Sequence, residues 1–216
     1  MTFSCVSDPS ALKDLVFGNC GVLQGIGPGK AYIDMSTVDV ETITDVHEAV
    51  TTRGGRFLEA PVIGSRQPAM NGQLLILAAG DRTLFDDCYS CLEAMGRQTF
   101  FLGEVGSATK MKLVISMLMG TVLAGLAESM ALAEHIGLDQ EEVLKILTLS
   151  PVSCPLVRTK GNAMMQAQFS NPHCRLHLCQ KDLRLAVNMS DTVEQPLHVA
   201  SAVNELFKNV KSKGFV

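Results

Sequence analysis

The sequence lacks a secretion signal, a membrane-length apolar run and an excess of positive charge. Its N-terminus, MTFSCVSDPSALKD, has neither a basic start nor an apolar run of signal length, so we expect a protein that is not secreted. No uninterrupted apolar stretch reaches about 18 residues, so we expect no membrane partner. The 18 Lys and Arg against 22 Asp and Glu give a formal net charge of -4. This balance offers no electrostatic basis for a nucleic-acid site in this chain.

The sequence also lacks a cysteine framework typical of disulfide-rich or zinc proteins. Its seven cysteines are an odd number, spread thinly over 216 residues, which indicates reduced thiols in the cytosol or nucleus. A lone C-x-x-C, at Cys88 and Cys91, falls inside a predicted helix. A second cluster has a spacing that matches no closed zinc site; it consists of His173, Cys174, His177 and Cys179. We therefore predict no metal site.

The glycine-rich loop of a dinucleotide-binding domain is absent as well. Such a domain normally opens with a strand, G-x-G-x-x-G and a helix. The only glycine-rich candidate, GIGPGK at residues 25–30, follows no strand and contains Pro28 where a helix would begin. We interpret it as a surface turn, with a phosphate loop as the weaker alternative. The sequence thus resembles a domain whose first βαβ units are missing.

What the first half does contain is an alternation of strands and helices. Short β-branched and aromatic runs alternate with polar helical segments, which is typical of βαβ units and a mostly parallel sheet. We expect strands at 2–7, 31–36, 56–62, 73–80 and 98–103, with helices at 11–18, 40–54 and 82–96 between them. We assign residues 1–103 to part of a Rossmann-type domain.

The second half, residues 104–216, shows only helical patterns. Residues 105–137 read as one helix that ends at Gly137, and at about 1.5 Å per residue it would be about 45 to 50 Å long, suited to joining two domains. Further helices are expected at 139–150, 155–168, 176–192 and 196–213. The predicted fold is therefore α/β followed by an all-α domain. The apolar faces of the long helix and of the C-terminal helices favour a homo-oligomer, either a dimer or a tetramer.

Several separate motifs occur in order from about residue 2 to about residue 212. They are SCVSDP, GVLQGIGPGKAYIDMSTVD, RGGRFLEAPVIGS, GQLLILAAGD, FFLGEVGSATKMK and QKDLRLA. In this order they resemble the β-hydroxyacid dehydrogenase family, most closely the branch that contains N-PAC-like nuclear factors and plant glyoxylate and succinic semialdehyde reductases. The resemblance implies a Rossmann-type NADP domain, with NAD as the alternative cofactor, followed by a helical domain.

The resemblance implies a catalytic lysine at Lys112. The family places its lysine nine residues after the first glycine of a G-x-x-G element, and Gly103, Gly106 and Lys112 fit that spacing, whereas Lys110 does not. On a helix the two lysines differ by about 200° in azimuth, so they cannot both face one site. An ammonium group there would donate a proton to a substrate carbonyl. The alternative is a surface lysine whose stem covers apolar neighbours.

Two departures from the family pattern weaken the expectation of turnover. The family has an asparagine one helical turn beyond its lysine, and here that position is Ser116. In the substrate-pocket signature P-V-S-G, Ile63 replaces the serine, while Gly64 and Ser65 remain. Each loss could slow the reaction by one or two orders of magnitude, at about 1.4 kcal/mol per tenfold.

Further residues match the family's cofactor contacts. Ser7, Asp8 and Pro9 form a strand-to-helix turn on the ligand side of an open α/β sheet, although Asp8 could equally serve only as a helix N-cap. Thr37 follows a strand, with a helix cap as the alternative role. Lys181 matches a lysine that reaches the cofactor, with an ordinary exposed Lys–Asp pair as the alternative.

The sequence therefore favours two alternative functions. The first is an NADP(H)-dependent reductase of a small aldehyde or keto acid, of the glyoxylate or succinic semialdehyde class, in which cofactor binding is weakened by the missing loop. The second is a catalytically silent, N-PAC-like oligomerising scaffold, associated with chromatin only through a missing N-terminal part. The first favours a cytosolic location and the second a nuclear one.

Overall fold

A computed structural model describes residues 1–169 and 174–214 of the chain. The chain divides into two compact units. The sheet unit comprises Met1–Ile115 with Asn188–Gln195, and the helical unit comprises Ser116–Val187 with Pro196–Val216. The division falls within the long helix α5 (Ser107–His135), between Ile115 and Ser116.

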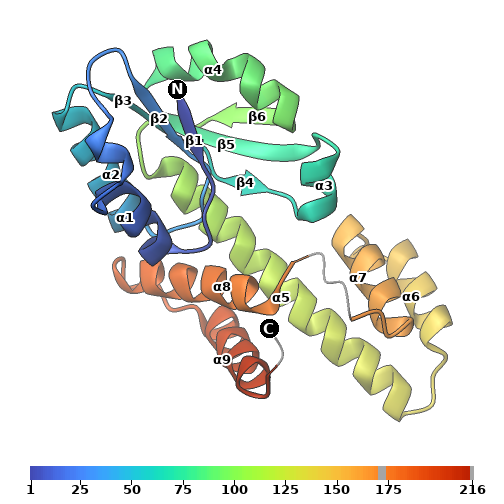
Figure 1. The fold of residues 1–216 in the computed structure, drawn as a ribbon. Helices are drawn as coiled ribbons and strands as arrows, with labels where there is room; N and C mark the ends of the chain where they lie inside the picture. Colours follow the sequence, from blue (N-terminus) through green and yellow to red (C-terminus); the bar gives the residue numbers. More distant parts are fainter. Residues whose placement is uncertain (170–173, 215–216) are drawn as a thin grey trace. The chain divides into compact units, whose positions relative to one another are not determined.

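The sheet unit alternates strands with helices (Figure 1), as the sequence predicted. Three short elements were not predicted, namely the 3-10 helix Val22–Gln24, the strand Val62–Ile63 and the helix Arg66–Met70. Ahead of α5 the elements are β1 (Thr2–Ser4), α1 (Pro9–Phe17), the 3-10 helix η1 (Val22–Gln24), β2 (Ala31–Asp34), α2 (Val40–Thr52), β3 (Arg56–Glu59), β4 (Val62–Ile63), α3 (Arg66–Met70), β5 (Leu74–Gly80), α4 (Arg82–Met95) and β6 (Gly96–Phe101).

The sheet has the strand order β1-β2-β3-β5-β4, and β6 pairs with β5 along Leu74–Ala78, a stretch that includes the residues paired with β4. Strands β1, β2 and β3 are parallel, as are β5 and β6, which confirms the partial Rossmann-type sheet. Strand β5 runs antiparallel to both β3 and β4. β4 follows β3 after a short link. The chain then reverses between β4 and β5, through α3, so that β5 runs opposite to both earlier strands.

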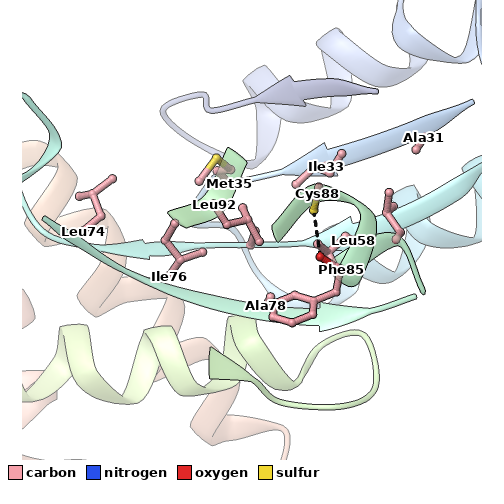
Figure 2. Close-up of a cluster of buried hydrophobic side chains, with 12 residues drawn as sticks. Ala31, Ile33, Met35, Leu58, Leu74, Ile76, Ala78, Phe85, Cys88 and Leu92 are labelled. Atoms are coloured by element: carbon pink, nitrogen blue, oxygen red, sulfur yellow. Dashed lines mark hydrogen bonds between the residues drawn. The ribbon is translucent and has the colours of Figure 1, made fainter. Parts of the chain in front are cut away.

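Alternating side chains build a core on each face of the sheet. Tyr32 and Phe57 pack with apolar residues of α1 and α2 on one face. Their neighbours Ile33 and Leu58 point to the other face and pack against α4, and Figure 2 shows Ile33 beside Cys88 and Leu58 beside Phe85. Successive side chains of a strand point to opposite faces of the sheet. The strands therefore supply apolar side chains to both faces, and helices cover each face.

The helical unit is all-α in the described residues, as predicted. It contains most of α5 together with α6 (Gln140–Leu149), α7 (Pro155–Met165), most of α8 (Leu176–Asp191) and α9 (His198–Ser212). One apolar cluster joins α5 to α8 and α9, and a second joins α5 to α6 and α7. A Cβ on Gly120 would lie 3.0 Å from the Leu183 side chain, so a glycine at this position lets α5 and α8 approach closely.

Helix α5 differs from one expectation. By length and composition alone it could cross a membrane, because an 18-residue window has a mean hydropathy of 1.7 with 33% of it buried. An average over a window tolerates the glycines, serines and threonines that interrupt the apolar run. The core helix of a soluble protein passes the same test, so this property is weak evidence for a membrane.

Two turns behave as the sequence predicted. Residues 25–30 form a turn between η1 and β2, and Gly29 adopts a φ of 76°, which favours glycine. The long helix ends before Gly137, whose φ is 79°. The interpretation of GIGPGK as a turn before a strand is therefore confirmed.

Candidate functional site

A buried carboxylate, that of Asp34, links the carboxyl ends of β1 and β2 through hydrogen bonds. The Oδ1 atom of Asp34 accepts hydrogen bonds from Ser4 Oγ at 2.6 Å and from Ser36 Oγ at 2.8 Å. The Ser36 hydroxyl in turn accepts a bond from the Val6 backbone N–H at 2.9 Å. Burial raises the pKa of Asp34 by more than these hydrogen bonds lower it. These hydrogen bonds link the loops that follow β1 and β2 at the carboxyl ends of the two strands.

The predicted cofactor residues of the sheet unit lie on these two loops. Asp8 is the N-cap of α1, accepting a backbone N–H from its first turn, and Ser7 Oγ donates to Asp8 Oδ2 at 2.7 Å. Pro9 is the first residue of α1. Thr37 is half-buried after β2, but α2 is capped by Asp39, so the alternative role of Thr37 as the helix cap is wrong. The loops thus present the Ser7 and Thr37 hydroxyls at one edge.

A second buried carboxylate holds the start of α5. Glu59, the last residue of β3, is fully buried, and its Oε1 accepts the backbone N–H groups of Gly106 at 2.6 Å and Ala108 at 3.1 Å. Its Oε2 accepts the Thr109 N–H at 3.2 Å and the Thr109 hydroxyl at 2.5 Å. Burial raises the pKa of Glu59 despite these four bonds. The turn of α5 that precedes Lys112 is therefore fixed to the sheet.

The two lysines of α5 differ in exposure. Lys112 is half-buried, whereas Lys110 is exposed, as expected for positions on different sides of one helix. One turn beyond Lys112, Ser116 is buried. The structure therefore distinguishes the candidate lysine from its solvent-facing neighbour.

The predicted substrate-pocket residues lie on and after β4. Ile63 is half-buried and packs against the apolar cluster that includes Ala108 of α5. Gly64 has a φ of 141°, and a Cβ there would lie 2.7 Å from the Leu74 side chain, so a glycine is required. Ser65 occupies the N-cap position of α3. The isoleucine thus adds an apolar contact at the position where the family presents a hydroxyl.

In the helical unit, three polar side chains form a buried cluster. Lys181 Nζ lies 3.1 Å from Asp182 Oδ1, and their side chains are 9% and 16% exposed. Ser116 Oγ donates to Asp182 Oδ2 at 3.0 Å, joining α5 to α8. The alternative of an ordinary exposed Lys–Asp pair is therefore wrong. The Asp182 carboxylate thus links Lys181 of the same helix to Ser116 of α5.

The cysteine clusters give no metal centre in the described part of the chain. There, no group of three or more His, Cys, Asp or Glu side chains could hold a metal ion. Cys88 is buried on α4, where burial raises the pKa of its thiol to about 11, and Cys91 is exposed. His173 lies outside the described residues, while Cys174 and Cys179 are described and lie close together.

Sequence reasoning missed the two carboxylates that organise the sheet unit. Asp34 and Glu59 each close an apolar strand, and each is fully buried. An acid as the last residue of a buried strand was the available signal, because a charged group there requires hydrogen-bonding partners. Its partners could not be read from the sequence, since those of Glu59 lie 47 to 50 residues away.

Comparison with known families matches both parts of the chain. Residues 1–103 match the NAD binding domain of 6-phosphogluconate dehydrogenase, and residues 106–215 match a domain described as NAD-binding of NADP-dependent 3-hydroxyisobutyrate dehydrogenase. Together the two matches account for nearly all of the chain.

Curated relatives include the cytokine-like nuclear factor N-PAC of Anopheles gambiae, 48% identical over 215 residues, and that of Homo sapiens, 49% identical over 212 residues. These matches cover 100% and 98% of this chain and 38% of each relative, so the chain spans well under half of their length.

Solved structures share the fold at low sequence identity. The 3-hydroxyisobutyrate dehydrogenase of Salmonella typhimurium superposes with a TM-score of 0.90 at 22% identity, over 99% of this chain and 74% of that one. Psf3 in complex with NADP+ and 2-OPP gives a TM-score of 0.89 at 22% identity, over 98% and 74%. The chain therefore belongs to the β-hydroxyacid dehydrogenase family and has its NAD(P)-binding fold.

Proposed function

We propose that this chain carries the proton-donating part of an NADP(H)-dependent reductase of a small aldehyde or keto acid, of the glyoxylate or succinic semialdehyde class, with impaired turnover. The observation that carries the proposal is the placement of Lys112. It is half-buried, and it lies just after the turn of α5 that Glu59 fixes to the sheet. A lysine that served only solubility would not require the start of its helix to be held by hydrogen bonds to a buried carboxylate.

In this proposal Lys112 acts as the acid. Its ammonium group donates a proton to the carbonyl oxygen of the substrate as that oxygen gains negative charge, and the same positive charge stabilises the developing alkoxide. A nicotinamide cofactor, when bound, supplies the reducing equivalents. Ser116 and Asp182 act as positioning residues for Lys181, because their hydrogen bond and ion pair fix the direction of its side chain.

The residues at the sheet edge fit one part of such a cofactor better than another. The hydroxyls of Ser7 and Thr37 can bond to a ribose or a carboxamide. The N-terminus of α1, which could otherwise receive a phosphate, is already capped by the carboxylate of Asp8, whose negative charge opposes an anion there. The chain also has no glycine-rich phosphate loop.

We therefore expect this chain alone to bind NADPH weakly, with an affinity below the micromolar range. Isothermal titration of the 216-residue chain measures this directly. Micromolar or tighter binding would show that the present residues suffice for the cofactor and would overturn this part of the proposal.

The assignment of the acid is tested in a longer protein, made by joining this chain to the N-terminal part of a related dehydrogenase. Lys112→Met should abolish aldehyde-dependent NADPH oxidation, whereas the matched variant Lys110→Met should leave it nearly unchanged, because Lys110 is exposed. Equal losses in both variants, with NADPH binding and folding intact, would exclude Lys112 as a specific acid.

The two departures from the family pattern can be repaired in the same protein. Ser116→Asn with Ile63→Ser should raise the rate about tenfold or more, if each change recovers about one hydrogen bond in the transition state. If the repaired protein folds and binds NADPH but reduces none of the small aldehydes tried, the reductase proposal fails.

The second candidate is a silent N-PAC-like scaffold that oligomerises within a nuclear, chromatin-associated protein. It is favoured by the apolar packing of Ile63 and by the 48% to 49% identity to proteins named as nuclear factors. The exposed apolar residues of α5 would then lie in a subunit interface; they include Met111, Val114, Leu118 and Met119. Light scattering should show a dimer or tetramer, and a stable monomer at tens of micromolar would count against the scaffold.

A further inference from the structure

Two cysteines at the start of α8 have their sulfur atoms in contact. Cys179 lies in the first turn of the helix, and its thiol donates a hydrogen bond to the sulfur of Cys174 at 3.4 Å. The carbonyl of Arg175 accepts the backbone N–H groups of Leu178 at 3.1 Å and Cys179 at 3.3 Å. This turn folds residue 174 back over residue 179, so the two sulfurs face each other without any covalent link.

The two thiols are not equivalent. Cys174 is exposed, whereas Cys179 is half-buried. The hydrogen bond to Cys174 and then burial raise the pKa of Cys179, with a further contribution from Asp182, while Lys160 opposes the rise. Cys179 therefore keeps its proton and shares it with Cys174, which is the sulfur that a dissolved oxidant reaches first.

Other thiols of the chain use their protons differently. Cys88 donates to the carbonyl of Phe85, and Cys5 donates to the carbonyl of Met35. Cys20 and Cys91 are exposed. Cys174 differs in having a second thiol beside it. When an exposed thiol is oxidised to a sulfenic acid, a neighbouring thiol can convert it to a disulfide, which protects the sulfur from further oxidation.

We propose that Cys174 and Cys179 are a redox modification site, which hydrogen peroxide converts to a disulfide within the chain and a dithiol reductant restores. The Cys174 sulfur attacks peroxide, the O–O bond breaks, and a sulfenic acid and water form. The Cys179 sulfur then attacks the sulfenic sulfur, losing its proton as the S–S bond forms and a second water leaves. Overall, two thiols lose two electrons and two protons to one peroxide.

The disulfide would tie residue 174 to the first turn of α8, directly before Lys181 and Asp182. This inference does not depend on the proposed reductase activity, because it concerns only thiol chemistry of the chain itself.

The sequence offers a direct assay for this bond. Trypsin cleaves after Lys160, Arg175 and Lys181, so the two cysteines fall on separate peptides, residues 161–175 and 176–181. The reduced full chain is treated with hydrogen peroxide, remaining thiols are alkylated, and the chain is digested without reductant. We expect the two peptides to be joined in the mass spectrum and released by dithiothreitol. Because Met164 and Met165 lie on the first peptide, its mass is also sought with added oxygen atoms.

Two variants and a control assign the roles of the sulfurs. Cys179→Ser should abolish the joined peptides and leave a sulfenic acid on Cys174 that dimedone traps, while Cys174→Ser should show neither product. The matched control Cys20→Ser, which removes another exposed thiol, should retain the joined peptides. Separate, alkylated peptides in the oxidised wild type would overturn the proposal. So would a bond from Cys174 to a different cysteine, or a disulfide between two chains.

Discussion

The two units of the chain hold their buried charges in different ways. In the sheet unit, Asp34 and Glu59 are carboxylates held by hydroxyls and backbone N–H groups. In the helical unit, the mostly buried carboxylate of Asp182 lies against the ammonium group of Lys181 and accepts a hydrogen bond from the Ser116 hydroxyl. One unit stabilises charge with dipoles, and the other with an opposite charge.

The difference has consequences for pKa values and for mutations. Dipoles alone do not offset the cost of burial, so the pKa values of Asp34 and Glu59 rise. An ion pair instead makes each partner depend on the other, because removing one leaves the other charged and buried. We therefore expect the helical unit to respond most to the loss of a charge, and the sheet unit to respond most to pH.

The largest expected effect is that of Lys181→Met. It removes the ammonium group that lies 3.1 Å from the mostly buried Asp182 carboxylate, which should lower the free energy of unfolding by about 3 to 5 kcal/mol. Urea denaturation measures the loss. The matched control Lys208→Met removes an exposed lysine that pairs with Glu205, and it should cost at most about 1 kcal/mol.

A double variant sharpens this prediction. Lys181→Met with Asp182→Leu removes both charges, so it should be more stable than Lys181→Met alone. If the double variant is less stable than the single one, then packing around the lysine stem, and not the unpaired charge, accounts for the loss.

The next effect is that of Glu59→Gln in the sheet unit. The amide group cannot accept at both ends, so it leaves at least one N–H group at the start of α5 without its acceptor, at a cost of about 1 to 3 kcal/mol. Glu104→Gln is the matched control, because Glu104 is exposed just before α5. The same denaturation experiment should show almost no change for the control, and an equal loss in both variants would contradict the special role of Glu59.

The smallest expected effect is a dependence on pH. Burial raises the pKa of Glu59 in the folded protein above its unfolded value of about 4.3, so the stability that its protonation contributes is fully present below that pH. This contribution is lost as pH rises through the folded pKa, by at most about 1.4 kcal/mol per pH unit. The stability advantage of the wild type over Glu59→Gln should therefore shrink as the pH rises above the unfolded pKa and through the raised pKa of the folded protein. An advantage that grows with pH would mean that the hydrogen bonds, and not burial, dominate.

The sequence predicted the elements better than their partners. Short β-branched and aromatic runs between helical segments predicted β2 and β3, and the apolar run up to Gly137 predicted α5. Both patterns are local in the sequence. It did not predict that β5 runs antiparallel to β3, since that depends on the short pairing of β4. Strand direction is set by the connection, which composition does not reveal.

The candidate residues show the same limit. The spacing from Gly103 distinguished Lys112 from Lys110 because one helix carries both. The link from Ser116 to Asp182 spans 66 residues, and nothing near either residue in the sequence predicts it. Side-chain chemistry at a site is thus visible locally, whereas the groups that hold it in place come from elsewhere in the chain.

The capping of α5 by Glu59 also bears on how the chain fluctuates. The amide protons of a helix's first turn have no acceptor within the helix, so they normally exchange with solvent deuterium early, as the end frays. Here the amides of Gly106, Ala108 and Thr109 are bonded to a fully buried carboxylate on another element. Their release requires the helix to separate from β3, so the beginning of α5 should exchange as slowly as the interior of the sheet.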